Sequence, residues 1–200
     1  MNYKEETQRT YNQYAEEFEK KFAKQFEKRV KKEAGIFLNF LEGKNIVDLG
    51  SGPGIHAAYF QEKCLNVLAV DSSKSMIRLC RKKNLKTKVM DMEQWNLPTN
   101  TFDGVWAYAS VLHLPKTKLK NVVENIRKTL KLKGVLGIAV KEGEGERFEE
   151  IPENPTAKRW FTYFTDEEFK DFFKKDFEIM HASRAEIIGS TFLYYIFRKK

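Results

Sequence analysis

The residues best suited to chemistry stand in one glycine-rich segment, Ile46–Gly54, which joins a short apolar run to a stretch with helical spacing. Each of its glycines can serve a different purpose. Gly50 permits a turn that a side chain would block, Gly52 lets the backbone approach a ligand closely, and Gly54 allows the next helix to begin tight against the strand. The amides freed at the start of that helix favour an anionic group, such as a carboxylate or a phosphate.

Three acidic residues near the ends of successive apolar runs narrow the choice of ligand. A carboxylate at Asp48, two residues before the first glycine, would repel a phosphate and attract an ammonium or a sulfonium. Asp71 can accept hydrogen bonds from both hydroxyls of a ribose, and Asp91 can accept one from the amine of an adenine, with Met92 against the ring. Singly, each acid could cap a helix or a turn. Together they predict a site for a positively charged nucleoside.

The elements that must position these residues follow from hydrophobic periodicity. Residues 3–33 have helical spacing with an aromatic-rich face, which either packs on the core or forms a lid over a pocket. A short helix is predicted near 36–41. Further along, strand-like runs at 45–49, 66–70, 87–90, 102–109 and 134–140 alternate with helical stretches at 54–63, 73–83 and 116–132. This alternation predicts a parallel sheet with helices on both faces.

The end of the chain breaks the alternation. A helix at 166–174 is followed by two β-type runs, 177–183 and 191–198, which we expect to form an antiparallel hairpin around Gly189. The stretch 142–165 has no clear period, and we interpret it as a long loop.

Beyond these patterns, the sequence resembles the class I S-adenosylmethionine-dependent methyltransferases over nearly its whole length, in particular the small single-domain types 11 and 25. The matching segments are Val47–Gly54, Asp71, Asp91-Met92, Phe102–Tyr108, Ser110–Leu114 and Leu130–Leu136, with Val135 where a second glycine is usual. The resemblance implies a doubly wound, Rossmann-like α/β fold with a seven-stranded sheet, an antiparallel last strand and helices on both faces. Residues 1–200 would form one domain, divided into an N-terminal helical lid (1–42) and a Rossmann-like core (43–200).

The resemblance also implies a cofactor, S-adenosylmethionine, with S-adenosylhomocysteine as the product. It places the methionyl part on the glycine loop, near Asp48 and Ala107, and the ribose on Asp71. It places the adenine between Met76 and Met92, with Asp91 on its amine. Tyr11 would close over the cofactor from a helix in which Asn12 replaces a commoner Asp. The cofactor-binding residues that it implies are Tyr11, Asp48, Gly50, Ser51, Gly52, Gly54, Asp71, Ser72, Met76, Asp91, Met92 and Ala107.

Methyl transfer from a sulfonium is an in-line displacement that depends chiefly on alignment and exclusion of water. A base adds to the rate only when the nucleophile carries a proton. His113 could act as that base or could be a loop residue bonded to backbone, and Tyr108 could orient the nucleophile or simply pack. Trp160 and Tyr163 could form a substrate wall if the 142–165 loop folds over the pocket. The alternative is a solvated acidic loop with an aromatic anchor.

The composition bounds the partners. The formal net charge is +8, but the lysine-rich stretches 74–88 and 116–133 should lie on opposite faces of the sheet. We therefore predict a small-molecule substrate, with an RNA-directed methyltransferase or a non-catalytic cofactor- and RNA-binding protein as alternatives. A nicotinamide or flavin oxidoreductase fits the glycine spacing and Asp48 less well.

The remaining expectations concern location and cysteines. The sequence offers neither a signal peptide nor a membrane span, so we expect a cytoplasmic protein. The spacing of Cys64 and Cys80 predicts no metal or redox pair, and we expect both to be packed as small apolar residues. Oligomeric state cannot be predicted.

Overall fold

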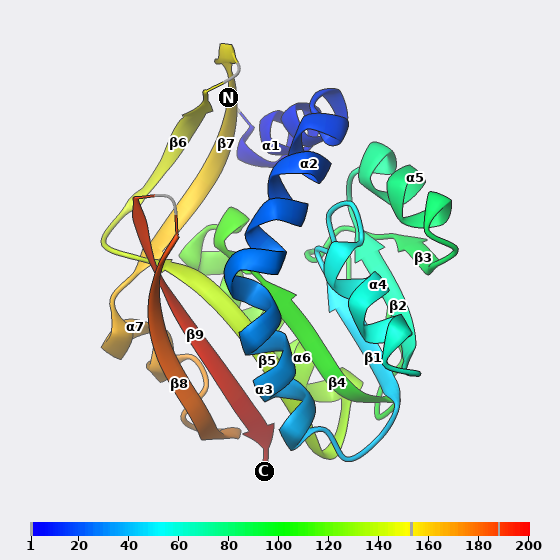
Figure 1. The fold of residues 1–200 in the computed structure, drawn as a ribbon. Coiled ribbons are helices and arrows are strands. Elements are labelled where there is room, and N and C mark those ends of the chain that lie inside the picture. The colour runs from blue at the N-terminus through cyan, green and yellow to red at the C-terminus, as the bar shows by residue number, and fades with distance from the viewer. Residues whose placement is uncertain (1, 153, 188) are drawn as a thin grey trace.

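The computed structural model describes residues 2–152, 154–187 and 189–200, and its chain path is drawn in Figure 1. Its elements in chain order are α1 (Tyr3–Gln13), α2 (Ala15–Gln25), a π-helical turn (Phe26–Val30), α3 (Lys31–Phe40), β1 (Asn45–Leu49), α4 (Ile55–Glu62), β2 (Asn66–Asp71), α5 (Lys74–Lys82), β3 (Lys86–Val89), β4 (Phe102–Tyr108), a 3-10 turn (Val111–His113), α6 (Lys116–Thr129), β5 (Leu130–Glu142), β6 (Glu146–Ile151), β7 (Asn154–Phe164), α7 (Asp166–Asp171), β8 (Phe177–Ile187) and β9 (Ser190–Lys199).

The central sheet has the predicted parallel order, but among the described residues it contains nine strands instead of the seven expected, because β7 and β6 extend it beyond β5. Strands β3, β2, β1, β4 and β5 are neighbours in that order and run parallel. Strand β9 pairs antiparallel with β5, from Val135 opposite Arg198 to Lys141 opposite Phe192, and β8 pairs antiparallel with β9. The doubly wound, Rossmann-like α/β fold is confirmed, with its antiparallel last strand and its terminal hairpin.

The segment 142–165 is not the loop that the sequence predicts. It forms an antiparallel hairpin of β6 and β7, whose far end pairs with the end of β5 through Lys141 and Tyr163. Its strands place opposite charges across from each other, with Glu149 facing Arg159 and Glu150 facing Lys158. A half-buried strand is recognised by alternating apolar and polar residues, and here charged residues occupy many of the positions where apolar ones would be expected. The sequence pattern therefore does not predict a strand.

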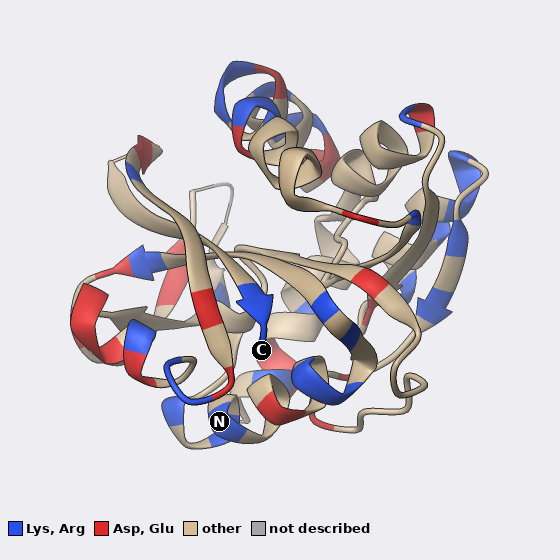
Figure 2. Ribbon diagram, turned by 90° about the horizontal axis from the view of Figure 1, so that it is seen from below, with Lys and Arg blue, Asp and Glu red and all other residues tan. Residues whose placement is uncertain are grey.

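Helices cover both faces of the sheet. On one face, α6 packs Leu119, Val122 and Ile126 into the larger hydrophobic cluster. On the other face, α3, α4 and α5 contribute Phe37, Phe60 and Cys80 to the second cluster. The lysine-rich helices α5 and α6 therefore lie on opposite faces, as predicted, and Figure 2 shows Lys and Arg spread over several elements with Asp and Glu between them.

The N-terminal region differs from the single helix predicted over 3–33. A break at Tyr14 separates α1 from α2, and a π-helical turn separates α2 from α3. The break has a structural reason: α1 buries Thr7 and Thr10 against β7, whereas α2 buries the apolar Phe18. A hydrophobic pattern cannot detect a helix that docks through hydroxyls.

Two further findings concern the expected location and cysteines. Among the described residues, no helix combines the length and the apolar character needed to cross a membrane. Cys80 is buried as expected, and burial raises the pKa of its thiol to about 12. Cys64 is exposed, so the expectation that it packs internally is wrong; it lies in the turn after α4 with a φ of 61°.

Candidate cofactor and acceptor site

The glycine loop is fixed at the carboxyl end of β1 by hydrogen bonds to the neighbouring strand. The amides of Gly50 and Ser51 both donate to the carbonyl of Val70, at 2.8 and 2.9 Å. A Cβ on Gly50 would lie 2.3 Å from the Cβ of Ser110, so this glycine is required by packing. At Gly52 a Cβ would meet only the ring of Phe22, at 4.0 Å. The protein thus leaves space above Gly52, as a backbone that contacts a ligand requires.

Asp71 ends β2 beside this loop. Its Oδ2 accepts from the Gly52 amide at 2.9 Å, and its Oδ1 accepts from the Ser73 amide at 2.8 Å. Burial raises the pKa of the carboxyl, while these amides act in the opposite direction. Each oxygen keeps a second lone pair. The two acceptor oxygens could therefore also accept from the two hydroxyls of a ribose, the role that the resemblance implies for Asp71.

One cavity joins the loop to the rest of the candidate site. Most of the predicted cofactor and catalytic residues line it, namely Tyr11, Gly50, Ser51, Gly52, Asp71, Ser72, Asp91, Met92, Tyr108 and His113. The predicted residues outside its wall are Asp48, Gly54, Met76, Ala107, Trp160 and Tyr163. Figure 1 shows α1 and α2 above the carboxyl ends of the parallel strands, where this cavity lies.

Asp48 lies beneath the loop instead of facing the cavity. Its side chain is 1% exposed, and its Oδ2 has no hydrogen-bond partner among the described residues. Burial, with the nearby Asp71 as a second cause, raises the pKa of the Asp48 carboxyl to about 8, although the Ala57 amide opposes this. Asp48 is therefore a titratable carboxyl held behind the loop, outside the cavity wall in which the sequence predicts it. A cation in the cavity would favour its ionised form.

Three of the predicted cofactor residues pack elsewhere. Met76 is buried with Phe18 below the junction of α1 and α2, so it does not flank an adenine in this cavity. Ala107 faces the larger cluster because neighbours on a strand point to opposite faces, and Tyr108 takes the cavity side. Gly54 is a packing residue, since a Cβ there would lie 2.7 Å from Leu85 Cδ1.

At the end of the cavity where the resemblance places an adenine, Lys4 of α1 contributes to the wall beside Asp91. Lys4 forms an ion pair with Asp91 at 2.7 Å and another with Glu93 at 2.9 Å. The other oxygen of Asp91 accepts from the Glu93 amide. No sequence pattern indicates that Lys4 would contact this acid. An adenine amine at Asp91 would share the carboxylate with Lys4.

His113 and Tyr11 belong to a chain of hydrogen bonds. The Nδ1 of His113 lies 2.6 Å from the Trp160 carbonyl, which can only accept, so Nδ1 carries the proton. The Nε2 lone pair then accepts from the Tyr11 hydroxyl at 2.7 Å, and Arg159 donates to that hydroxyl at 3.1 Å. Burial, assisted by Arg159, lowers the pKa of His113 to about 3. The lone pair that a base would use is engaged, and in this arrangement His113 positions Tyr11.

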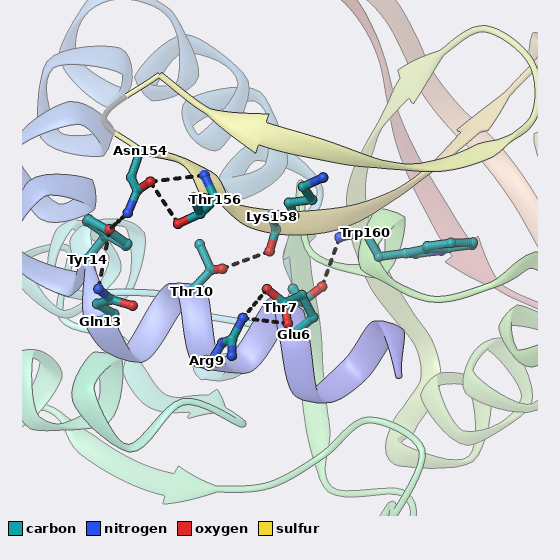
Figure 3. Close-up of polar contacts among 10 residues, drawn as sticks. All are labelled: Glu6, Thr7, Arg9, Thr10, Gln13, Tyr14, Asn154, Thr156, Lys158 and Trp160. Atoms are coloured by element: carbon teal, nitrogen blue, oxygen red, sulfur yellow. Dashed lines mark hydrogen bonds and ion pairs between the residues drawn. The ribbon is translucent and has the colours of Figure 1, made fainter. Parts of the chain in front are cut away.

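The β6–β7 hairpin packs against α1, and its described residues do not cover the cavity. Thr10 donates to the Lys158 carbonyl at 2.7 Å, Trp160 N donates to Thr7 at 2.9 Å, and Asn154 donates to the Tyr14 hydroxyl at 2.7 Å (Figure 3). The expected aromatic substrate wall of Trp160 and Tyr163 is therefore wrong, because the hairpin holds α1 and neither side chain lines the cavity.

Several of the acidic residues in this segment form ion pairs. Glu142 pairs with Arg184, Glu149 with Lys141 at 2.7 Å, and Glu150 with Lys158 at 3.6 Å. Glu146 accepts from the Lys116 amide at 2.7 Å. Ion pairs of this kind leave little net charge to attract a cationic substrate.

Helix α1 is also attached to the cofactor side of the sheet. The side-chain oxygen of Asn12, Oδ1, accepts from the Ser73 hydroxyl at 2.8 Å and from the Ser75 amide at 3.1 Å. Gln8 donates to the Ser72 carbonyl at 2.7 Å. An amide oxygen serves here as well as a carboxylate would, which accounts for Asn12 at a position where Asp is commoner.

The second half of the cavity is lined by residues that sequence patterns did not assign to the site. They are Phe22, Gln25, Val30, Ile55, His56, Ile187 and Phe192, together with Tyr108. They come from α2, the π-helical turn, α4, the β8–β9 hairpin and β4, and only tertiary structure brings them together. The π-helical turn is the one local feature of this wall that is typical of functional sites. Its sequence, Phe26–Val30, contains no pattern that predicts a π-helix. No group of three or more His, Cys, Asp or Glu side chains suited to a metal occurs in the described part of the chain.

Comparison with known proteins supports the class that these features define. Residues 46–134 match the family model of a methyltransferase domain. An uncharacterized methyltransferase of Schizosaccharomyces pombe is 28% identical over 104 residues, which cover 48% of this chain and 40% of that protein. The chain thus matches less than half the length of this curated relative.

Solved structures share the fold. A methyltransferase of Methanosarcina mazei described as S-adenosylmethionine-dependent has a TM-score of 0.74 and 18% identity, over 82% of this chain and 96% of that one. The 1,6-didemethyltoxoflavin-N1-methyltransferase of Burkholderia thailandensis, solved with its substrate and S-adenosylhomocysteine, has a TM-score of 0.69 and 20% identity, over 94% and 89% of the chains. The fold that the resemblance implies is thus confirmed, and residues 46–134 match a methyltransferase domain.

Proposed function

We propose that this chain is an S-adenosylmethionine-dependent methyltransferase that methylates a small molecule. The observation that carries the proposal is the single cavity that begins at Gly52 and Asp71 and continues to Tyr108. Its first half offers acceptors for a ribose and an open backbone at the loop. Its second half offers a wall of apolar and aromatic side chains. Such a cavity can hold a cofactor and an acceptor end to end, as in-line transfer requires.

The residues of this chain would bind and align the reactants. When bound, the cofactor supplies an activated methyl group. Asp71 and the Gly52 backbone would hold its nucleoside, with Lys4 and Asp91 at the adenine end. The Tyr11 hydroxyl, kept in place by His113 and Arg159, would close the site from above and exclude water. Residues 1–42 would act as the lid that the sequence suggested, with α1 attached to both α5 and β7.

A small acceptor is supported by the way the second half of the cavity is enclosed. Phe22, Gln25 and Val30 approach from the helical side, while Ile187 and Phe192 approach from the β8–β9 hairpin. A nucleic acid would need a wide opening lined with cations, whereas these side chains are neutral. The basic residues are instead distributed over the surface (Figure 2). RNA therefore remains the alternative that the experiment must test.

The test has two steps. Calorimetry should show saturable binding of S-adenosylmethionine and of S-adenosylhomocysteine, and no comparable binding of NAD. Methyl-labelled cofactor should then be incubated with a metabolite extract and, separately, with total RNA. Label in the metabolite fraction alone supports the proposal. Label in RNA alone overturns the small acceptor, and absence of cofactor binding overturns the enzymatic function.

A further inference from the structure

Two buried polar groups, one of them in the cavity wall, have no hydrogen-bond partner among the described residues. The hydroxyl of Tyr108 and the Oε2 of Glu33 are both buried without a hydrogen bond to any described residue. Each residue is only 9% exposed. A buried polar atom without a partner costs roughly 1–3 kcal/mol. A pair of such atoms beside a ligand cavity indicates that a ligand supplies what the protein lacks.

The two groups are neighbours. Tyr108 lines the cavity from β4, and Glu33 lies on α3 one turn beyond Val30, which lines the same wall. The hydroxyl stabilises the ionised carboxyl of Glu33, although neither makes a well-aligned hydrogen bond in this conformation. Burial nevertheless raises the pKa of Glu33. The backbone of Glu33 is held from below, since Tyr194 donates to its carbonyl at 3.1 Å.

The surrounding residues leave this end of the cavity negative. His56 accepts from the Trp106 indole at 3.0 Å through Nδ1, and burial lowers its pKa to about 4, so the ring is neutral at pH 7. Lys32 and Arg29 are the nearest cations to Glu33 and Tyr108, and both side chains are exposed to solvent. Glu33 is therefore the buried acidic group that interacts with Tyr108, and Tyr108 is the residue of the pair that lines the cavity.

The rest of the wall selects the body of the ligand. Phe22, Ile55, Ile187 and Phe192 are apolar, and the ring of Tyr108 stacks on Trp106 at a centroid distance of 5.5 Å. Aromatic faces also attract cations, particularly in a site with little water. The π-helical turn that carries Val30 forms part of this wall, and such turns occur frequently at functional sites.

Building on the proposed function, we propose that Tyr108 and Glu33 form the polar end of the acceptor pocket and bind the amine of a small, largely apolar substrate. When a ligand binds, the Tyr108 hydroxyl can turn to donate to Glu33 and accept from the ligand, so the ligand must donate a hydrogen bond. The Glu33 charge then favours an ammonium over a hydroxyl and excludes a carboxylate. Tyr108 contacts the ligand, and Glu33 acts through it.

The test uses three probes that share an aromatic body and differ in the head group: 2-phenylethylamine, 2-phenylethanol and 3-phenylpropanoate. Their affinities are measured by calorimetry on the full chain saturated with S-adenosylhomocysteine. In the wild type the amine should bind best and the carboxylate worst, at least about tenfold apart, as expected for a hydrogen bond to a charged group. Glu33→Gln should weaken the amine about tenfold and leave the alcohol unchanged. Tyr108→Phe should weaken both.

Tyr195→Phe is the matched control, because Tyr195 is a buried tyrosine of the same strand as Tyr194, β9, and packs in the larger cluster on the opposite face of the sheet. It should leave all three probe affinities unchanged. The inference is overturned if the carboxylate binds as tightly as the amine, if no probe binds at millimolar concentration, or if Glu33→Gln leaves the amine affinity intact. Tight S-adenosylhomocysteine binding in the same samples separates these outcomes from a failure of the proposed function.

Discussion

The hydroxyl of Tyr11 lies 2.7 Å from the Nε2 of His113, and this contact joins the N-terminal helix to the turn that follows β4. Both residues line the cavity, although 102 positions separate them in the sequence. Because His113 is fixed by the Trp160 carbonyl, the pair sets the height at which α1 covers the cofactor site. The position of each side chain therefore depends on the other, and substitutions of the two residues should show this dependence in the free energy of cofactor binding.

Single substitutions of this pair should therefore be non-additive. We expect Tyr11→Phe and His113→Asn each to weaken S-adenosylhomocysteine binding by about 1–2 kcal/mol, the range for a buried hydrogen bond. The double variant should lose little more than either single one, which calorimetry on all four proteins would show. Additive losses would mean that the two residues act separately.

The same geometry predicts the pH dependence of methyl transfer. With its pKa lowered to about 3, His113 stays neutral from pH 5 upward, so kcat should show no inflection near pH 6.5 that His113→Asn removes. The measurement is a pH–rate profile of both proteins with the same acceptor. An inflection near 6.5 that disappears in the variant would restore the role of general base for His113.

Asp71 should control cofactor affinity. Replacing it with Asn keeps the shape but removes the charge that accepts the ribose hydroxyls, and a loss of roughly tenfold or more in affinity follows. Asp103→Asn is the matched control, since Asp103 begins β4 at the opposite end of the sheet and bonds Lys131 at 2.8 Å. Calorimetry with S-adenosylhomocysteine should separate them, and equal losses would remove Asp71 from the site.

The glycines of the loop should respond differently to alanine. At Gly50 the added Cβ lies 2.3 Å from Ser110 Cβ and φ is +70°, so Gly50→Ala should destabilise the fold by about 3 kcal/mol or more. At Gly52 there is room, and only the cost of a left-handed φ, about 1 kcal/mol, applies. Gly52→Ala should fold but bind cofactor poorly, as urea unfolding and calorimetry can show. A Gly52→Ala protein with normal affinity would place the ligand elsewhere.

These results show where sequence reasoning succeeds. The core strands β1, β2 and β4 are short apolar runs, β1 is followed by a glycine and β2 ends in an acid, and their alternation with helices predicts a parallel sheet. The positions of Asp71 and Gly52 follow from that topology, because the carboxyl ends of adjacent parallel strands meet. Local pattern and global fold agree at these positions.

Other parts of the molecule depend on contacts that no local pattern encodes. The hairpin of β6 and β7 alternates charge instead of hydrophobicity, and α1 docks through Thr7 and Thr10. Met76 has helical spacing, yet the break at Tyr14 brings α2 over it. The acceptor wall joins α2 to β9, which are separated by most of the chain. Such pairings are decided by tertiary packing and need coordinates.

The burial of Asp48 leads to the last prediction, which concerns stability. Its carboxyl has a pKa raised from 3.8 to about 8 by burial and Asp71, so the folded protein keeps a proton that the unfolded chain releases near pH 4. The free energy of unfolding therefore falls as pH rises from about 4 to about 8, and this contribution is constant above that. Asp48→Asn removes this pH-dependent contribution. The free energy of unfolding of the variant should therefore increase relative to that of the wild type as the pH rises from about 4 to about 8.

Urea unfolding of cofactor-free protein between pH 5 and pH 9 would measure this difference. Asp103→Asn supplies the opposite sign, because Lys131 and the Asn45 amide hold the pKa of Asp103 below its usual value. That contribution is present above about pH 4 and is lost on acidification, so its removal should destabilise the protein at every pH tested. A stability difference for Asp48→Asn that does not change with pH would show that Asp48 is ionised in the folded chain, and that the cavity already contains a compensating charge.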